Sequence, residues 1–117
     1  MKDRAIEYFA AFNNQDTTKL REIYSEDVVL RDWIVEVSGR ENVINENKKG
    51  WEANKEVFIG VKNLFYDGDT VIAEIDIFIE DKQGGNVHLK VADILEFRTD
   101  SSNQAKLVSI RAYLGNS

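Results

Sequence analysis

Residues 88–97 read "HLKVADILEF", a stretch that places one carboxyl group in a row of apolar side chains. A β-strand sends alternate side chains to opposite faces, so Asp93 has apolar neighbours on its own face. These neighbours are Leu89, Val91, Leu95 and Phe97. Burying an unpaired carboxylate is costly in free energy. The pattern therefore predicts that Asp93 is paired, protonated or used in chemistry.

The composition is that of a globular domain, with 117 residues of which 43% are hydrophobic and 31% charged. No repeat, low-complexity linker or change of composition divides the chain, so we expect a single domain over residues 1–117. The formal net charge is -6, from 21 acidic and 15 basic residues. This charge argues against nucleic acid and anionic membranes as partners.

Rare and absent residue types narrow the chemistry further. The chain has no cysteine, which excludes disulfides, thiolate metal sites and a cysteine nucleophile. Its single histidine, His88, excludes a multi-histidine metal site and leaves little for a Ser-His-Asp triad. The opening "MKDRAIEYFAAF" is charged and amphipathic, unlike a signal peptide or a membrane span. We expect a cytoplasmic protein that works without a metal or cofactor.

Three helices are predicted in the first half of the chain. Apolar residues at helical spacing predict an amphipathic helix over about residues 2–12. Asp16 or Thr17 can cap a second, short helix. The apolar residues of this second helix are Leu20, Ile23 and Tyr24. Ser38 and Glu41 have the spacing of a capping box, which predicts the start of a third and very polar helix.

The remaining segments favour strands. The run "DVVLRDWIVEV" (residues 27–37) predicts one strand, and four more strand-like runs follow from Val57, with a hairpin at Asp67-Gly68. Three apolar rows are expected on the inner face: Val28, Leu30, Asp32 and Ile34; Ala73, Ile75, Ile77 and Ile79; and Val108, Ile110, Ala112 and Leu114. Helices followed by an antiparallel sheet indicate an α+β fold, and a curved sheet could enclose a small-molecule pocket.

Two segments resemble a known superfamily. They are "EYFAAFNNQDTTKLREIYSEDVVLRDW" (residues 7–33) and "VADILEF" followed later by "KLVSIRAYLG". Both are similar to the nuclear-transport-factor-2-like superfamily, which includes ketosteroid isomerases and SnoaL-type polyketide cyclases. The similarity covers nearly the whole chain. It implies a cone-shaped roll of three N-terminal helices on a curved, mostly antiparallel sheet that encloses a pocket.

Within the superfamily, ketosteroid isomerase is the nearest functional resemblance, and three residues carry it. Tyr8 falls where the isomerase has a tyrosine that donates to the substrate carbonyl, and Asp32 falls where it has its catalytic base. Asp93, in the pattern "D-x-hydrophobic-x-F", falls where it keeps a protonated aspartic acid. The resemblance implies that Asp32 abstracts a proton next to a carbonyl while Tyr8 and Asp93 stabilise the enolate oxygen.

The chain also departs from the isomerase pattern. Asn47 lies where the isomerase has another pocket tyrosine, and Trp33 follows the base where the isomerase has proline. The third helix is much more polar than a steroid-binding mouth would suggest. Two alternatives therefore stay open: a SnoaL-type polyketide cyclase in which Asp93 is the main acid–base group, and a non-catalytic small-molecule-binding module.

Other side chains are expected to bind a small hydrophobic molecule or a second chain. The expected binding residues are Phe12, Tyr24, Trp33, Asn47, Trp51, Val91, Leu95 and Leu114. His88 has the opposite parity to Asp93 and is expected outside the pocket. Glu74 and Asp76 are expected on a solvated or dimer-facing surface. Because superfamily members commonly dimerise through the sheet, we expect a homodimer.

Overall fold

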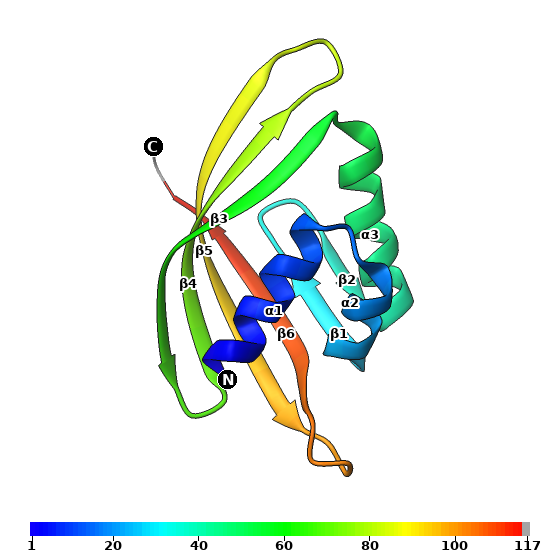
Figure 1. Cartoon of the computed structure of the whole chain (residues 1–117), viewed down its shortest axis with the longest axis vertical. Helices are drawn as coiled ribbons and strands as arrows, with labels where there is room; N and C mark the ends of the chain where they lie inside the picture. Colours follow the sequence, from blue (N-terminus) through cyan, green and yellow to red (C-terminus); the bar gives the residue numbers. More distant parts are fainter. Residues whose placement is uncertain (116–117) are drawn as a thin grey trace.

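Three helices cover one face of a curved six-stranded sheet (Figure 1). The structure is a computed structural model that describes residues 1–115. The helices are α1 (Lys2–Asn13), α2 (Thr17–Ile23) and α3 (Arg40–Ala53). The strands are β1 (Tyr24–Arg31), β2 (Glu36–Ser38), β3 (Glu56–Asp67), β4 (Thr70–Glu80), β5 (Asn86–Thr99) and β6 (Ala105–Leu114). The order in the sheet is β2-β1-β6-β5-β4-β3, and only the β1–β6 pair is parallel. The predicted α+β fold class is confirmed.

The ends of α2 and α3 show which predicted caps form. The Asp16 side chain accepts a hydrogen bond from the Lys19 N–H at 3.0 Å and caps α2 as predicted. The predicted capping box of α3 is wrong. Gly39 is its N-cap at φ +94°, without a side-chain cap bond, and Glu41 instead pairs with Arg21 at 3.0 Å. Tyr24 also lies outside α2, because its extended backbone already begins β1.

The predicted strand over residues 27–37 is two short strands joined by a turn. Oδ1 of Asp32 accepts the N–H groups of Ile34 and Val35 at 2.7 and 2.8 Å. An aspartate that satisfies the following backbone in this way stops a strand and makes a turn. Ile34 therefore lies at the turn and is 79% exposed, where it borders the cavity and is not buried in an inner row as predicted.

The predicted inner row of β6 is also interrupted. Phe97 pairs with Leu107, but the preceding Glu96 pairs with Ser109, so Val108 is an extra residue in a bulge. Leu107 fills the core in place of Val108. Beyond the bulge the alternation resumes, and Ile110 and Ala112 face inward as predicted.

The apolar core lies between the helices and the concave face of the sheet. Its fully buried members include Leu20 of α2, Ile44 of α3 and Leu95 of β5. The β4–β5 hairpin continues past the helices at the top of Figure 1, along the 46 Å long axis of the molecule. None of the helices within residues 1–115 is long and apolar enough to cross a membrane.

One side chain ties α1 to β3 through two hydrogen bonds. Asn13 Nδ2 donates to the Ile59 carbonyl at 2.8 Å, and the Ile59 N–H donates to Asn13 Oδ1 at 2.8 Å. Since β3 is the last strand of the sheet, these groups of Ile59 have no neighbouring strand to bond. The Asn13 amide thus takes the place of a strand at this position.

We expect Asn13→Ala to lower the free energy of unfolding by about 1–3 kcal/mol, because it leaves a buried backbone donor and acceptor unsatisfied. Asn14→Ala is the matched control, since Asn14 is exposed on the same helix end and should cost far less. Urea unfolding followed by circular dichroism measures both. Equal losses for the two variants would contradict the role of the Asn13 amide.

Candidate active site

A cavity of about 500 Å³ lies between the concave face of the sheet and helices α1 and α3. Its polar lining includes all three predicted catalytic residues, Tyr8, Asp32 and Asp93. The rest of the lining is Phe12, Leu30, Trp33, Ile34, Glu46, Asn47, Lys49, Gly50, Ile59, Ile75, Ile77, Ile79, Leu89, Ile110 and Ala112. A volume of this size suits a small organic ligand.

Asp93 is buried in the middle of β5 between two alanines. It pairs with Ala73 of β4 on one side and with Ala112 of β6 on the other. The small neighbours leave open space above the carboxyl group, and no residue within 1–115 donates a hydrogen bond to it. Burial raises the pKa of Asp93 to about 7, and the charge of nearby Asp32 contributes to this rise. The carboxyl group can therefore keep its proton near neutral pH, where an ordinary aspartate has lost it.

Tyr8 is placed in the cavity by the buried face of α1 and is supported from behind by Tyr24. The two rings lie 6.0 Å apart, and their hydroxyl groups share a hydrogen bond. Asn47 Nδ2 donates to the Tyr24 hydroxyl at 2.7 Å. The bond between the tyrosines raises the pKa of Tyr8 and lowers that of Tyr24, so Tyr8 donates and the Tyr24 oxygen accepts from both Tyr8 and Asn47. A ligand oxygen in the cavity would therefore take the Tyr8 proton in place of Tyr24.

Both tyrosines keep their protons at neutral pH. Burial raises the pKa of Tyr8 well above its ordinary value, and the charges of Tyr24 and Asp93 raise it further. Burial also raises the pKa of Tyr24 to about 12, although the hydrogen bonds from Asn47 and Tyr8 act in the opposite direction. Tyr8 is thus a neutral donor whose proton does not leave readily.

Asp32 reaches the same cavity from the turn after β1. Its Oδ1 is held by the two backbone N–H groups of the turn, which fixes the side chain. Its Oδ2 accepts no hydrogen bond from any residue in the described range 1–115, so it can accept a proton from a ligand. One fixed carboxylate and two neutral donors are the groups needed for proton abstraction next to a carbonyl.

The predicted binding residues divide into two groups. Phe12, Trp33 and Asn47 line the cavity, whereas Tyr24 lies behind Tyr8 and Trp51 packs on Phe12 with ring centroids 5.3 Å apart. Three further residues expected at the ligand also lie outside the lining: Val91, Leu95 and Leu114. Val91 and Leu95 are buried on the inner face of β5, and Leu114 is 46% exposed at the end of β6.

Several lining residues were not predicted as ligand contacts. The alternation of β4 does predict that Ile75, Ile77 and Ile79 face inward, but alternation cannot separate a core wall from a cavity wall. The contributions of Glu46 and Lys49 depend on where α3 crosses the sheet, and no local pattern shows this. Within residues 1–115, no group of three or more histidine or carboxylate side chains is arranged to hold a metal ion.

Comparison with solved structures identifies the class of fold. A SnoaL-like polyketide cyclase, described as putative, from Shewanella denitrificans OS-217 superposes with a TM-score of 0.83 at 17% identity, covering 97% of this chain and 89% of that one. A hypothetical protein with a ketosteroid isomerase-like fold from Catenulispora acidiphila, crystallised with trimethylamine, gives 0.82 at 17% identity, covering 94% and 83%. An LEH-like epoxide hydrolase from M. tuberculosis gives 0.81 at 14% identity, covering 97% and 80%.

The fold is thus that of the nuclear-transport-factor-2-like superfamily, as the sequence resemblance implied. The sequence profile of the SnoaL-like domain matches residues 5–102. The chain belongs to this family. No curated protein sequence matches it. At these low identities the solved structures establish the fold alone, and an activity has to be inferred from the residues of the cavity.

The raised pKa of Asp93 predicts a pH-dependent stability. The folded protein binds this proton more tightly than the unfolded chain, so wild-type stability should fall as pH rises from about 4 to 7. Asp93→Asn removes the buried charge, and its stability relative to wild type should rise by up to roughly 4 kcal/mol over this window. Urea unfolding of both proteins across the pH range measures the difference.

Asp76→Asn is a control with the opposite sign. The hydrogen bond from His88 lowers the pKa of Asp76, so this carboxylate stabilises the fold above pH 4 and loses that effect as the pH falls. Stability curves for wild type and Asp93→Asn that run parallel from pH 4 to 8 would contradict a buried, raised Asp93.

Proposed function

We propose that the protein is a cofactor-free acid–base catalyst acting on a small hydrophobic carbonyl compound, in the manner of a ketosteroid isomerase. The observation that supports this most is the presence of Tyr8, Asp32 and Asp93 in one cavity with an otherwise largely apolar lining. Each residue comes from a separate element, so their meeting is not a consequence of sequence proximity. The burial of Tyr8 and Asp93, both 5% exposed, limits competition from water.

The proposed reaction moves one proton between two carbons of the substrate. Oδ2 of Asp32 takes a proton from the carbon next to the carbonyl, and the electron pair of the broken C–H bond moves into the enolate. Tyr8 and protonated Asp93 donate hydrogen bonds to the carbonyl oxygen as it gains charge. Asp32 then returns the proton to a different carbon, so the product is an isomer and no oxidant or second substrate is needed.

The environment of each residue favours its proposed role. Oδ1 of Asp32 is anchored in the turn, so the carboxylate loses little further freedom when it reacts. The raised pKa of Asp93 lets a carboxylic acid keep a proton that it can donate near pH 7. Contact with Tyr24 holds the Tyr8 hydroxyl at the cavity before charge appears on the substrate, and donors fixed in advance are how such sites stabilise a transition state.

A SnoaL-type cyclisation is the second candidate, favoured by the family to which the chain belongs. In that reaction Asp93 would be the main acid–base group, and its lack of a protein hydrogen-bond partner suits this role equally well. The third alternative is a binding module in which the same cavity holds a ligand without turnover. The isomerase proposal makes Asp32 essential for turnover, the cyclase proposal makes Asp93 the main acid–base group, and the binding module has no turnover.

We expect Asp32→Asn to lower turnover by about 10²–10⁴-fold while ligand binding and folding survive. Asparagine keeps an Oδ1 that accepts the Ile34 and Val35 N–H groups, so the turn is preserved and only the base is lost. The assay follows conversion of a β,γ-unsaturated ketosteroid to the conjugated enone by ultraviolet absorbance. Thermal unfolding and ligand titration of the same variant provide the controls.

The outcomes of this assay have distinct meanings. No conversion by folded wild-type protein would overturn the ketosteroid reaction. Normal turnover of a carbonyl substrate by Asp32→Asn, together with its loss in Asp93→Asn, would replace the proposal with the cyclase-type mechanism. Ligand binding without turnover in every variant would leave the binding module.

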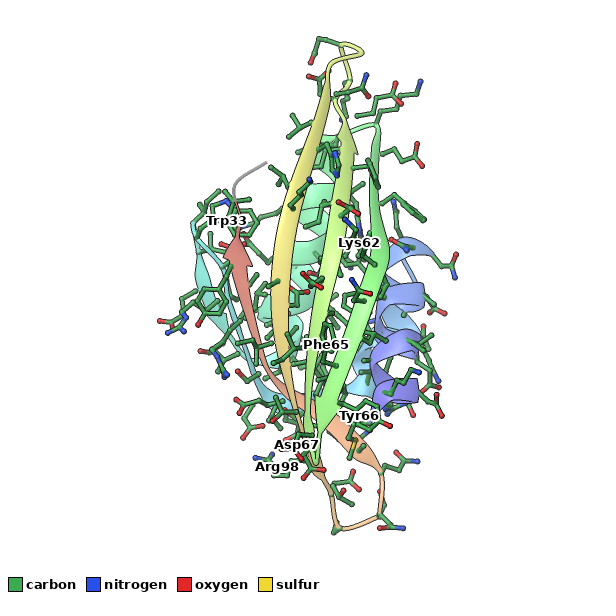
Figure 2. All side chains as sticks on the ribbon, turned by 90° about the vertical axis from the view of Figure 1, so that its left-hand side faces the viewer. Trp33, Lys62, Phe65, Tyr66, Asp67 and Arg98 are labelled. Carbon is green, nitrogen blue, oxygen red and sulfur yellow. The ribbon has the colours of Figure 1, made fainter. Side chains whose placement is uncertain are left out.

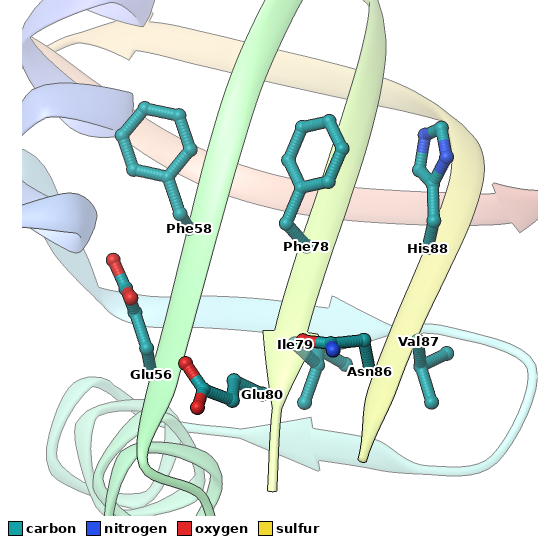
Figure 3. Close-up of a pocket in the computed structure, with 8 residues that line it drawn as sticks. All are labelled: Glu56, Phe58, Phe78, Ile79, Glu80, Asn86, Val87 and His88. Atoms are coloured by element: carbon teal, nitrogen blue, oxygen red, sulfur yellow. The ribbon is translucent and has the colours of Figure 1, made fainter. Parts of the chain in front are cut away.

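We also propose that the protein forms a homodimer through the outer face of the sheet. Figure 2 views this face, where Phe65 and Lys62 lie over β3. Figure 3 shows Phe58, Phe78 and His88 side by side on β3, β4 and β5, with Glu56, Glu80 and Asn86 in the next row. The large apolar residues of this face are 41–56% exposed: Phe58, Phe65, Ile72, Phe78 and Tyr113.

A second copy of the chain suits this surface because it carries both signs of charge beside its apolar groups. Lys62 and Lys90 lie near Asp76, and Glu74 is adjacent on β4. A twofold axis would place such a mixed surface against itself, with aromatic groups at the centre.

We expect wild-type protein to sediment at twice the mass of one chain and Ile72→Glu to sediment as a monomer, because a charge would enter the apolar patch beside Phe65. Ile6→Glu is the control, since Ile6 is 46% exposed on α1 and lies outside this patch. A monomeric wild type at micromolar concentration, or a dimeric Ile72→Glu, would contradict the proposed interface.

A further inference from the structure

The cavity is extended along one strand. Its lining follows the inner face of β4 through Ile75, Ile77 and Ile79, starting beside Ala73, the partner of Asp93. At about 3.3 Å per residue, the distance along β4 from Ala73 to Ile79 is about 20 Å. A sphere with the volume of the cavity would be only about 10 Å across. The ligand space is therefore long and narrow.

The two ends of this space differ in chemistry. Tyr8, Asp32 and Asp93 belong to the end beside Ala73. Along the sheet the far end has an apolar floor, formed by Ile77 and Ile79 of β4 and Leu89 of β5. These far residues are half-buried, whereas Ile75 is 3% exposed. The floor thus becomes more open toward the end of the β4–β5 hairpin, which continues past the helices in Figure 1.

No residue within 1–115 covers Ile77 and Ile79 completely, although they follow Ala73 and Ile75 of the core on the same face of β4. Half-exposed apolar residues in an unbroken row beside a polar end match a molecule with a carbonyl head and an apolar tail. The tail would cover the remaining surface of the row and be removed from water itself, which is the usual source of affinity for apolar ligands.

We propose that the substrate of this site is a carbonyl compound with an extended, unbranched apolar tail. The carbonyl binds beside Tyr8 and Asp93, and the tail lies along β4 over Ile75, Ile77 and Ile79. This inference rests on the proposed function for the position of the carbonyl head. The inference adds that the affinity of the site for a substrate depends on the length of the apolar tail.

The test is the affinity of straight-chain methyl ketones, from hexan-2-one to dodecan-2-one, measured by isothermal titration calorimetry. Each added methylene that reaches the apolar row should tighten binding by about two- to fourfold, until the tail reaches Ile77, about 13 Å from Ala73 along β4. Ile77→Asn should weaken the longest ketones by at least about tenfold and leave hexan-2-one unchanged, because only long tails reach this residue.

Ile6→Asn is the matched control, since it makes the same change at an exposed position on α1 outside the cavity and should leave the whole series unchanged. An affinity that does not depend on chain length, or equal effects of Ile77→Asn and Ile6→Asn, would overturn the tail groove. Binding is measured here without turnover, so this result is independent of the enone assay. A failure of that assay counts against the ketosteroid reaction and leaves the chain-length result unaffected.

Discussion

The register of β4, β5 and β6 is the constraint on which the site depends. It places Asp93 between Ala73 and Ala112, so that the smallest side chains of the inner face stand beside its one buried carboxyl group. A shift of one residue would turn Asp93 to the outer face and put its apolar neighbours in water. The apolar row of β5 therefore fixes the register, and the register in turn keeps the carboxyl group buried.

This arrangement separates the residues that stabilise the fold from those that could do chemistry. Leu95 and Phe97 fill the core below Asp93, whereas Tyr8 and Asp32 approach it from a helix and a turn. Each of these two is held by its own local bonds, one to Tyr24 and the other to the backbone of the turn. The burial of Asp93 costs stability above pH 4, so this carboxyl group does not contribute to folding at neutral pH.

Much of the fold could be predicted from sequence because period-two alternation and helical spacing report directly on burial. The predicted strands are wrong where a local feature interrupts the regular alternation of side chains. Asp32 ends β1 by bonding to the backbone that follows it, and the bulge at Val108 shifts the start of β6. The cavity residues Glu46 and Lys49 could not be found, because their position depends on how α3 crosses the sheet. The alternation of side chains along β5 predicts that Asp93 lies on the inner face. The sequence does not show that Ala73 and Ala112 flank it, because this depends on the register between strands.

The bond between Asn13 and Ile59 also bears on how the protein avoids aggregation. A long outermost strand such as β3 offers unpaired backbone groups that could recruit a strand from another molecule. The Asn13 amide occupies both groups of Ile59, and the irregular pairing near Lys62 disturbs the ladder a few residues further on. A side chain from α1 thus blocks strand addition at this edge of the sheet. Loss of Asn13 would therefore shorten the solution lifetime of the protein by more than its effect on unfolding alone.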